Sequence, residues 1–319
     1  MEQQFSHQPV LLEECIQALN INPNGIYLDG TLGRGGHSLE IAKRLTGGRL
    51  ICVDRDESAI REAKVRLAPY QDRIVFVHSN FSGINGILDE LHLVGVDGIL
   101  LDLGVSSPQL DDGSRGFSYM AEAPLDMRMD RSGGITAFDV VNQWPQGELR
   151  RILYQYGEER YAPQIAAALF RRRAERPIET TTELVEIIKS AMPAKARKEK
   201  QHPAKRSFQA IRIAVNDELA EVEAALCSAV PRLNRTGRFA VITFHSLEDR
   251  IVKTIFADLA RGCTCPPDFP VCVCGKTPEI KRISKKPILP SQRELEDNSR
   301  ARSAKLRVAE KLKDADNAP

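Results

Sequence analysis

The chain has 319 residues and a formal net charge of +2; 42% of its residues are hydrophobic and 28% are charged. This composition is typical of a globular protein of about two domains and excludes a wholly disordered chain. No apolar run reaches the roughly 18 residues of a membrane span, and no secretory signal opens the sequence, so we expect a cytoplasmic protein with no membrane contact.

Helices and strands alternate over the first hundred residues. Amphipathic helical patterns cover residues 9–19, 38–45, 58–67 and 83–91. Short apolar runs at 26–28, 50–53, 74–77 and 96–101 read as buried strands. Continuous apolar strands that alternate with helices predict an α/β fold with a parallel, doubly wound sheet.

The pattern changes after about residue 113, where strand signals disappear until residue 238. Helical patterns cover 149–156, 162–173, 183–191, 208–215 and 217–230, and strands are predicted at 238–244 and 305–308. Thr180 and Glu183 form a predicted capping box before the third of these helices. We therefore predict one α/β domain, built from residues 1–112 and 216–319, with an all-helical insertion at 113–215.

A glycine-rich loop follows the first strand and runs from Asp29 through Gly33, Gly35 and Gly36 to His37. Such a turn is where doubly wound folds bind nucleotides. The dinucleotide motif G-x-G-x-x-G is incomplete because Ser38 takes the place of its third glycine, which disfavours an NAD-dependent oxidoreductase. The pattern D-x-x-x-G-x-G-G instead resembles the first motif of S-adenosylmethionine-dependent methyltransferases.

Two further acids end predicted strands near this loop. Asp54 closes the second strand, where a carboxylate accepts hydrogen bonds from ribose hydroxyls, and Asp102 closes the fourth. Carboxylates suit the sulfonium and ammonium of adenosylmethionine better than they suit a pyrophosphate. The alternative is that the three acids only cap turns. Phe81, after the third strand, is expected either beside the adenine or in the core.

The loop after the fourth strand contains Ser107, Pro108 and Gln109. Methyltransferases that act on exocyclic amines carry a polar-Pro-Pro-aromatic loop here, and Ser107-Pro108-Gln109 is a degenerate version of it. The lone pair of a cytosine N4 amine is conjugated with the ring, so hydrogen bonds that orient the amine can replace a strong base. We predict that Ser107 and the backbone before Pro108 orient the amine, with Asp102 behind them.

These motifs together resemble the bacterial small-subunit ribosomal RNA cytosine-N4 methyltransferases. The matching stretches are residues 7–12, 29–38, 53–56, 98–112, 116–118, 124–130, 156–160, 202–216, 244–253 and 299–308. The resemblance implies a class I, Rossmann-like methyltransferase fold with a helical substrate-recognition insertion, and methylation of a cytidine N4 in the decoding region. It also implies adenosylmethionine contacts at Gly35, Gly36, His37, Asp54, Phe81, Asp102 and Gln109.

Basic residues cluster between Lys195 and Arg212, a stretch that contains seven basic residues and one acidic residue. Such a cluster favours a polyanion partner, here small-subunit rRNA or the small ribosomal subunit, although a solvated face is the plain alternative. The candidate substrate residues are Lys205, Arg206, Phe208, Arg212 and His245. A methyltransferase for another RNA or for DNA, or an RNA-binding module without activity, are the competing hypotheses.

Four of the seven cysteines are close together in the sequence, as C-x-C pairs at Cys263 and Cys265 and at Cys272 and Cys274. Four thiolates can hold a structural zinc ion, but zinc ligands are usually two to four residues apart within a pair. We assign no catalytic metal, and both zinc and free reduced thiols remain open.

Overall fold

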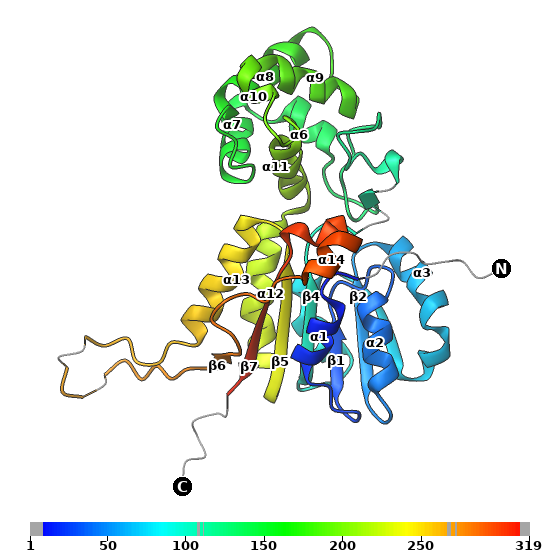
Figure 1. Cartoon of the computed structure of the whole chain (residues 1–319), viewed down its shortest axis with the longest axis vertical. Coiled ribbons are helices and arrows are strands. Elements are labelled where there is room, and N and C mark those ends of the chain that lie inside the picture. The colour runs from blue at the N-terminus through cyan, green and yellow to red at the C-terminus, as the bar shows by residue number, and fades with distance from the viewer. Residues whose placement is uncertain (1–8, 107–108, 111, 267–268, 272, 313–319) are drawn as a thin grey trace. The chain divides into compact units, whose positions relative to one another are not determined.

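The computed structural model describes residues 9–106, 109–110, 112–266, 269–271 and 273–312. The chain divides into two compact units (Figure 1). Residues 1–104 and 219–319 form the first, which we call the sheet unit, and residues 105–218 form the second, the helical unit. The sequence pattern placed these limits at 113 and 215.

The described residues of the sheet unit form a seven-stranded sheet in the order β3-β2-β1-β4-β5-β7-β6. Strands β1 to β5 pair in parallel, and β7 pairs antiparallel with both β5 and β6. The strands are β1 (Ile26–Asp29), β2 (Arg49–Asp54), β3 (Ile74–His78), β4 (Val96–Asp102), β5 (Leu233–Thr243), β6 (Ile280–Arg282) and β7 (Lys305–Lys311). The Rossmann-like α/β fold is confirmed, with an antiparallel end to the sheet that the sequence pattern did not predict.

Both faces of the sheet are covered because consecutive strand residues point to opposite sides. Leu50 and Cys52 pack with α1, α2 and α3, whereas Ile51 and Val53 pack with α4, α12 and α13. The helices of this unit are α1 (Leu12–Leu19), α2 (Gly36–Arg44), α3 (Glu57–Leu67), α4 (Ile84–Glu90), α12 (Glu218–Ala229), α13 (Ser246–Leu259) and α14 (Gln292–Asp297). The first residue of α12, Glu218, belongs to the helical unit.

The helical unit has its own buried core. Its helices are α6 (Ala137–Gln143), α7 (Gln146–Gln155), α8 (Ala162–Glu175), α9 (Thr181–Ala191), α10 (Ala194–Arg197) and α11 (Lys205–Asn216). The predicted capping box of Thr180 and Glu183 begins α9, and a second one, of Thr136 and Asp139, begins α6. Across the described residues of both units, no helix combines the length and the apolar character needed to cross a membrane.

Some elements differ from the expectation. The first helix starts at Leu12 instead of residue 9, because Leu11 has φ of 53° and cannot continue a right-handed helix. Strand β5 starts at Leu233, before a polar stretch in which Thr236 has φ of 66°. The sequence pattern also did not predict α6, α10, α13, α14 and β6.

Candidate functional site

Three aspartates lie at the carboxyl edge of the sheet, each at the end of one of three adjacent strands. Asp29 ends β1, Asp54 ends β2 and Asp102 ends β4, and β1 lies between the other two strands. Asp29 pairs in register with Cys52 of β2 and Leu100 of β4, so the other two aspartates each stand two residues further along. The direction of winding reverses between β1 and β4, and doubly wound sheets bind ligands at such an edge.

The glycine-rich loop after β1 is fastened to both neighbouring strands. The N–H of Gly33 donates to Oδ2 of Asp54 over 2.8 Å, and the N–H of Asp102 donates to the hydroxyl of Thr31 over 2.6 Å. Gly33 has φ of 51°, and the atom nearest to a Cβ built there would be the carbonyl oxygen of Thr31, 4.0 Å away. The loop therefore offers open backbone, next to a carboxylate, to a ligand.

Glycine is required at position 36 for a different reason from that at position 33, namely close packing against Pro9. A Cβ at this position would lie 2.3 Å from Cγ of Pro9, so only glycine lets the segment before α1 pass this close to the start of α2. Gly35, with φ of 72°, is the N-cap of α2. Packing inside the sheet unit therefore accounts for Gly36 without a ligand.

Burial raises the pKa of Asp29 and of Asp54, in each case to about 6. Asp29 is held by the Ser38 hydroxyl, which donates to Oδ2 over 2.6 Å, and by the Thr31 N–H, which donates to Oδ1 over 3.1 Å. Asp54 accepts the N–H of Asp56 over 2.8 Å as well as that of Gly33. Both carboxylates therefore fix the loop, and a nearby cation would favour their ionised form.

Asp102 is the most perturbed of the three. Burial, followed by the charges of Asp29 and Glu248, raises its pKa to about 8. Its Oδ1 is buried and finds no hydrogen-bond partner among the described residues. A buried carboxylate oxygen without a donor is costly, so this atom fits a ligand that supplies an N–H or a positive charge.

His37 lies beneath the same edge. Its Nε2 donates to the carbonyl of Val10 over 3.1 Å, which leaves Nδ1 as the bare nitrogen, 3.8 Å from Oδ2 of Asp102. Burial lowers the pKa of His37 to about 4. A neutral imidazole therefore supports the loop and the segment before α1, and it adds no positive charge beside Asp102.

The remaining predicted cofactor residues are more scattered. Phe81 starts a short 3-10 helix and packs, partly buried, against the core under α4. Gln109 is buried in the helical unit, where its Oε1 accepts the N–H of Ser106 over 3.1 Å. Ser107 and Pro108 lie outside the described residues, so their predicted roles stay predictions.

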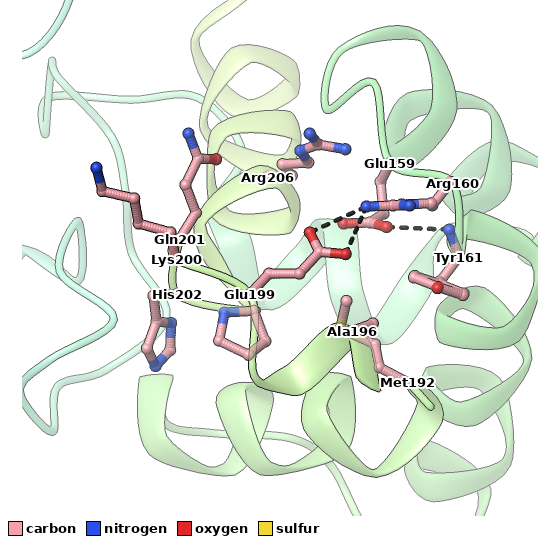
Figure 2. A pocket seen from close by; sticks show the side chains of 11 residues that line it. Glu159, Arg160, Tyr161, Met192, Ala196, Glu199, Lys200, Gln201, His202 and Arg206 are labelled. Atoms are coloured by element: carbon pink, nitrogen blue, oxygen red, sulfur yellow. Dashed lines mark hydrogen bonds and ion pairs between the residues drawn. The ribbon is translucent and has the colours of Figure 1, made fainter. Parts of the chain in front are cut away.

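A pocket of about 160 Å³ opens in the helical unit beside the predicted basic cluster (Figure 2). Arg206 lines it and donates to the carbonyl of Glu158 over 3.1 Å, whereas Lys205 is exposed nearby at the start of α11. Figure 2 shows Arg160 and Glu199 pointing at each other across the pocket, joined by hydrogen bonds of 2.7 and 2.9 Å. Basic side chains therefore line the pocket, but Glu199 neutralises the charge of Arg160.

The structure corrects one predicted substrate residue, Phe208, and gives another, Arg212, an acidic partner. Phe208 is only 3% exposed and packs in the core of the helical unit, with its ring edge-on to Tyr119, so it has no free face for a base. Arg212 donates two hydrogen bonds of 2.8 Å to the buried carboxylate of Glu218. The helical period turns Phe208 into the core, whereas Arg212 is only partly buried, and its predicted contact with RNA stays a prediction.

His245 is the N-cap of α13. Its Nδ1 accepts the N–H of Glu248 over 3.4 Å, and the carboxylate of Glu248 accepts the N–H groups of Phe244 and His245. The N-cap accounts for Nδ1, whereas Nε2 is buried, lies 3.1 Å from Oε1 of Glu248 and makes no hydrogen bond with the described residues, so the predicted substrate role of His245 stays a prediction. Glu248 was not among the predicted site residues, yet its charge helps to raise the pKa of Asp102.

Sequence reasoning also missed Thr31 and Ser38. Thr31 joins the loop to β4, and Ser38 holds Asp29. Ser38 takes the place of the third glycine of the dinucleotide motif. A hydroxyl at this position, so close in the sequence to Asp29 at the end of the strand, could have predicted the hydrogen bond between them. Of the four clustered cysteines, Cys272 lies outside the described residues, and the sulfurs of the other three lie together.

Comparisons with known proteins agree over almost the whole chain. The model of the MraW methylase family matches residues 4–312. Ribosomal RNA small subunit methyltransferase H of Brevibacillus brevis is 57% identical over 309 residues, which cover 97% of this chain and 98% of that protein. The protein of the same name from Heliobacterium mobile is 54% identical, over 97% of this chain and 100% of its own. A solved putative rRNA-methylase from Clostridium thermocellum aligns over 96% of this chain and 100% of its own, with a TM-score of 0.46 and 11% identity.

Proposed function

The chain belongs to the MraW methylase family, and from that premise we propose that it methylates the N4 amine of a cytidine in the decoding region of small-subunit rRNA. The methyl donor is S-adenosylmethionine. The name shared by the relatives, ribosomal RNA small subunit methyltransferase H, supports the small-subunit rRNA as substrate and therefore the cytoplasm as the place of action. The N4 position and the decoding region rest on the sequence resemblance.

One observation carries the proposal for the donor, namely the three aspartates around an open glycine loop. Adenosylmethionine is a cation with a transferable methyl group on sulfur, and it has no phosphate. The proposed roles are Asp54 for the ribose hydroxyls, Gly33 and Gly35 for close backbone contact, and Asp102 for the positively charged end. The buried Oδ1 of Asp102 fits that assignment, because no described residue donates a hydrogen bond to it.

The chemistry of the acceptor favours orientation over strong base catalysis. The N4 nitrogen is itself the nucleophile, so the protein has to hold the amine and exclude competing geometries. We assign this role to Ser107 and the carbonyl before Pro108. Asp102 contributes by holding negative charge at the donor end when the cation is bound, which lowers its pKa from the value of about 8 in the free chain.

The cysteines near the glycine loop argue against methylation at cytosine carbon 5, in which a thiolate must first add to the ring. Cys15 and Cys52 are fully buried, and burial raises the pKa of both thiols well above the usual value. Neither is therefore a ready thiolate. A nitrogen acceptor needs no such group.

We assign rRNA binding to the helical unit, with Lys205 and Arg206 as phosphate contacts. Both belong to the basic start of α11, beside the pocket of Figure 2. An amino methyltransferase that acts on another RNA or on DNA is the competing function, because it would use the same donor and the same amine chemistry.

The test is methyl transfer from labelled adenosylmethionine to small ribosomal subunits, to naked small-subunit rRNA and to DNA, followed by digestion to nucleosides. We expect N4-methylcytidine in one of the two ribosomal substrates, and loss of label with Asp102→Ala. Label in 5-methylcytidine, or in DNA alone, would overturn the proposal.

A further inference from the structure

The described residues of the segment between α13 and β6, which spans residues 260–279, form no hydrophobic core of their own. It extends away from the sheet in yellow and orange in Figure 1, and none of its described residues is buried. Even its apolar side chains are in solvent, with Phe269 52%, Val271 69% and Val273 73% exposed. Burial of apolar surface therefore does not hold this segment in one conformation.

Three thiols nevertheless converge within it. The sulfurs of Cys263, Cys265 and Cys274 all lie within 4.8 Å of one another, and those of Cys263 and Cys274 are 3.7 Å apart. With metal–sulfur bonds of about 2.3 Å, two thiolates in a tetrahedral zinc site lie about 3.8 Å apart. A disulfide requires about 2.05 Å. The spacing therefore fits a shared metal ion.

The backbone around the sulfurs also fits thiolates. Each of the three sulfurs accepts one N–H over 3.4 Å: Cys263 from Cys265, Cys265 from Val273, and Cys274 from Thr264. Hydrogen bonds to ligating atoms disperse negative charge and fix the ligand orientation in metal sites. These three hydrogen bonds hold the three sulfurs close together. Surface thiols without a shared function would not require such an arrangement.

We propose that Cys263, Cys265 and Cys274 bind one structural zinc ion that orders residues 260–279. Soft thiolates in tetrahedral geometry select zinc over the hard cations Mg²⁺ and Ca²⁺. Each thiol releases its proton as its bond to the metal forms, so binding is tighter at higher pH. Cys272 is outside the described residues, so the proposal names only the three described thiols.

The site is independent of methyl transfer, because these cysteines lie on a projecting segment and not at the carboxyl edge that carries Asp29, Asp54 and Asp102. The role of the site is structural, because the metal would link Cys263 and Cys265 to Cys274 and so constrain the intervening loop, which contains Phe269 and Val271. The readouts are therefore metal content and local order, and the result does not depend on the proposed substrate.

The experiment uses the full-length, reduced chain, stripped of metal and then given Zn²⁺ alone. After gel filtration we expect about one equivalent of zinc per chain. Limited proteolysis within residues 260–279 should be fast without zinc and slow with it. Co²⁺ in place of Zn²⁺ should give the visible absorption of a tetrahedral cobalt thiolate.

The triple variant Cys263→Ser, Cys265→Ser, Cys274→Ser should lose the bound zinc and the protection from proteolysis. The matched control is Cys227→Ser, an exposed cysteine on α12, which should keep both. Thermal unfolding of each variant tests whether the sheet unit is still folded, so that loss of zinc can be distinguished from loss of the fold. Zinc retained by the triple variant, no zinc bound by the wild-type chain, or a disulfide among these cysteines in the reduced, zinc-treated protein would overturn the proposal.

Discussion

Nδ1 of His37 lies 3.8 Å from Oδ2 of Asp102, yet the two groups do not form an ion pair at neutral pH. Burial lowers the pKa of His37 to about 4 and raises the pKa of Asp102 to about 8, so both are neutral in the free chain. Asp102 can therefore acquire its charge when a cationic ligand arrives, whereas His37 remains a neutral support.

The affinity for adenosylmethionine should rise with pH between about 6 and 8. The bound cation lowers the pKa of Asp102 from about 8, so binding below that pH releases a proton, and the affinity gains up to about tenfold per pH unit for one proton. Calorimetry in buffers of different ionisation enthalpy measures the release. Asp102→Asn is the control, because it keeps the titration of the cofactor's own amine. Equal proton release by both proteins would refute the role of Asp102.

Asp102 should also make the ligand-free chain less stable as pH rises. A carboxyl whose pKa is higher in the folded state binds more protons when folded, so its contribution is present at low pH and is lost between about 4 and 8. Asp102→Asn should therefore have a higher midpoint of thermal unfolding than the wild type at pH 8 to 9, and the difference should shrink toward pH 5. A constant difference would show that the effect is not protonation.

Asp54→Ala should weaken binding of adenosylmethionine by about 1.5–3 kcal/mol, or roughly 10- to 150-fold in Kd. The substitution removes the proposed ribose contact and also frees the N–H of Gly33, which Asp54 accepts over 2.8 Å. Titration calorimetry measures the loss. Asp72→Ala, at an exposed acid of the same unit, should bind normally. Wild-type affinity in Asp54→Ala would remove this residue from the site.

Replacing Lys205 and Arg206 by Ala should weaken binding to small-subunit rRNA and reduce its dependence on salt. Each lost phosphate contact lowers the slope of log K against log salt by roughly 0.7–0.9. The control is Arg150→Ala with Arg171→Ala, which removes the same charge from exposed positions on α7 and α8. If both pairs change the slope equally, the effect is one of net charge and the proposed surface is wrong.

Phe208→Ala should unfold the helical unit more easily, by about 3–5 kcal/mol, because Phe208 fills the core of that unit. Phe170→Ala, at a half-exposed aromatic on α8, should cost much less. Denaturant unfolding compares the two. If Phe208→Ala keeps wild-type stability and loses only RNA binding, our correction of its role is itself wrong.

The parallel strands were predictable because each is a short apolar run ended by a polar residue or a turn. Predicted strands at 50–53 and 96–101 became β2 and β4, with Asp54 and Asp102 at their ends. Since neighbouring parallel strands end at one edge, the three acids could be placed together from sequence alone. The antiparallel pairing of β7 could not be predicted, because an apolar run does not show the direction in which a strand pairs.

The errors have local causes. Phe208 was assigned to the RNA-binding surface because its neighbours are basic, but α11 turns it into the core. Helix α6 was missed although Thr136 and Asp139 cap it, since its seven residues are too few for a clear apolar period. The interactions of Asp102 with His37 and Glu248 join distant parts of the chain, and no spacing shows them.

The most direct test of the central claim is mass mapping of small-subunit rRNA from a strain that lacks this protein. We expect that one cytidine in the decoding region loses a methyl group on N4, that the wild-type chain restores it, and that Asp102→Ala does not. An unchanged methylation map in the deletion strain, or a loss at carbon 5 or on another base, would contradict it.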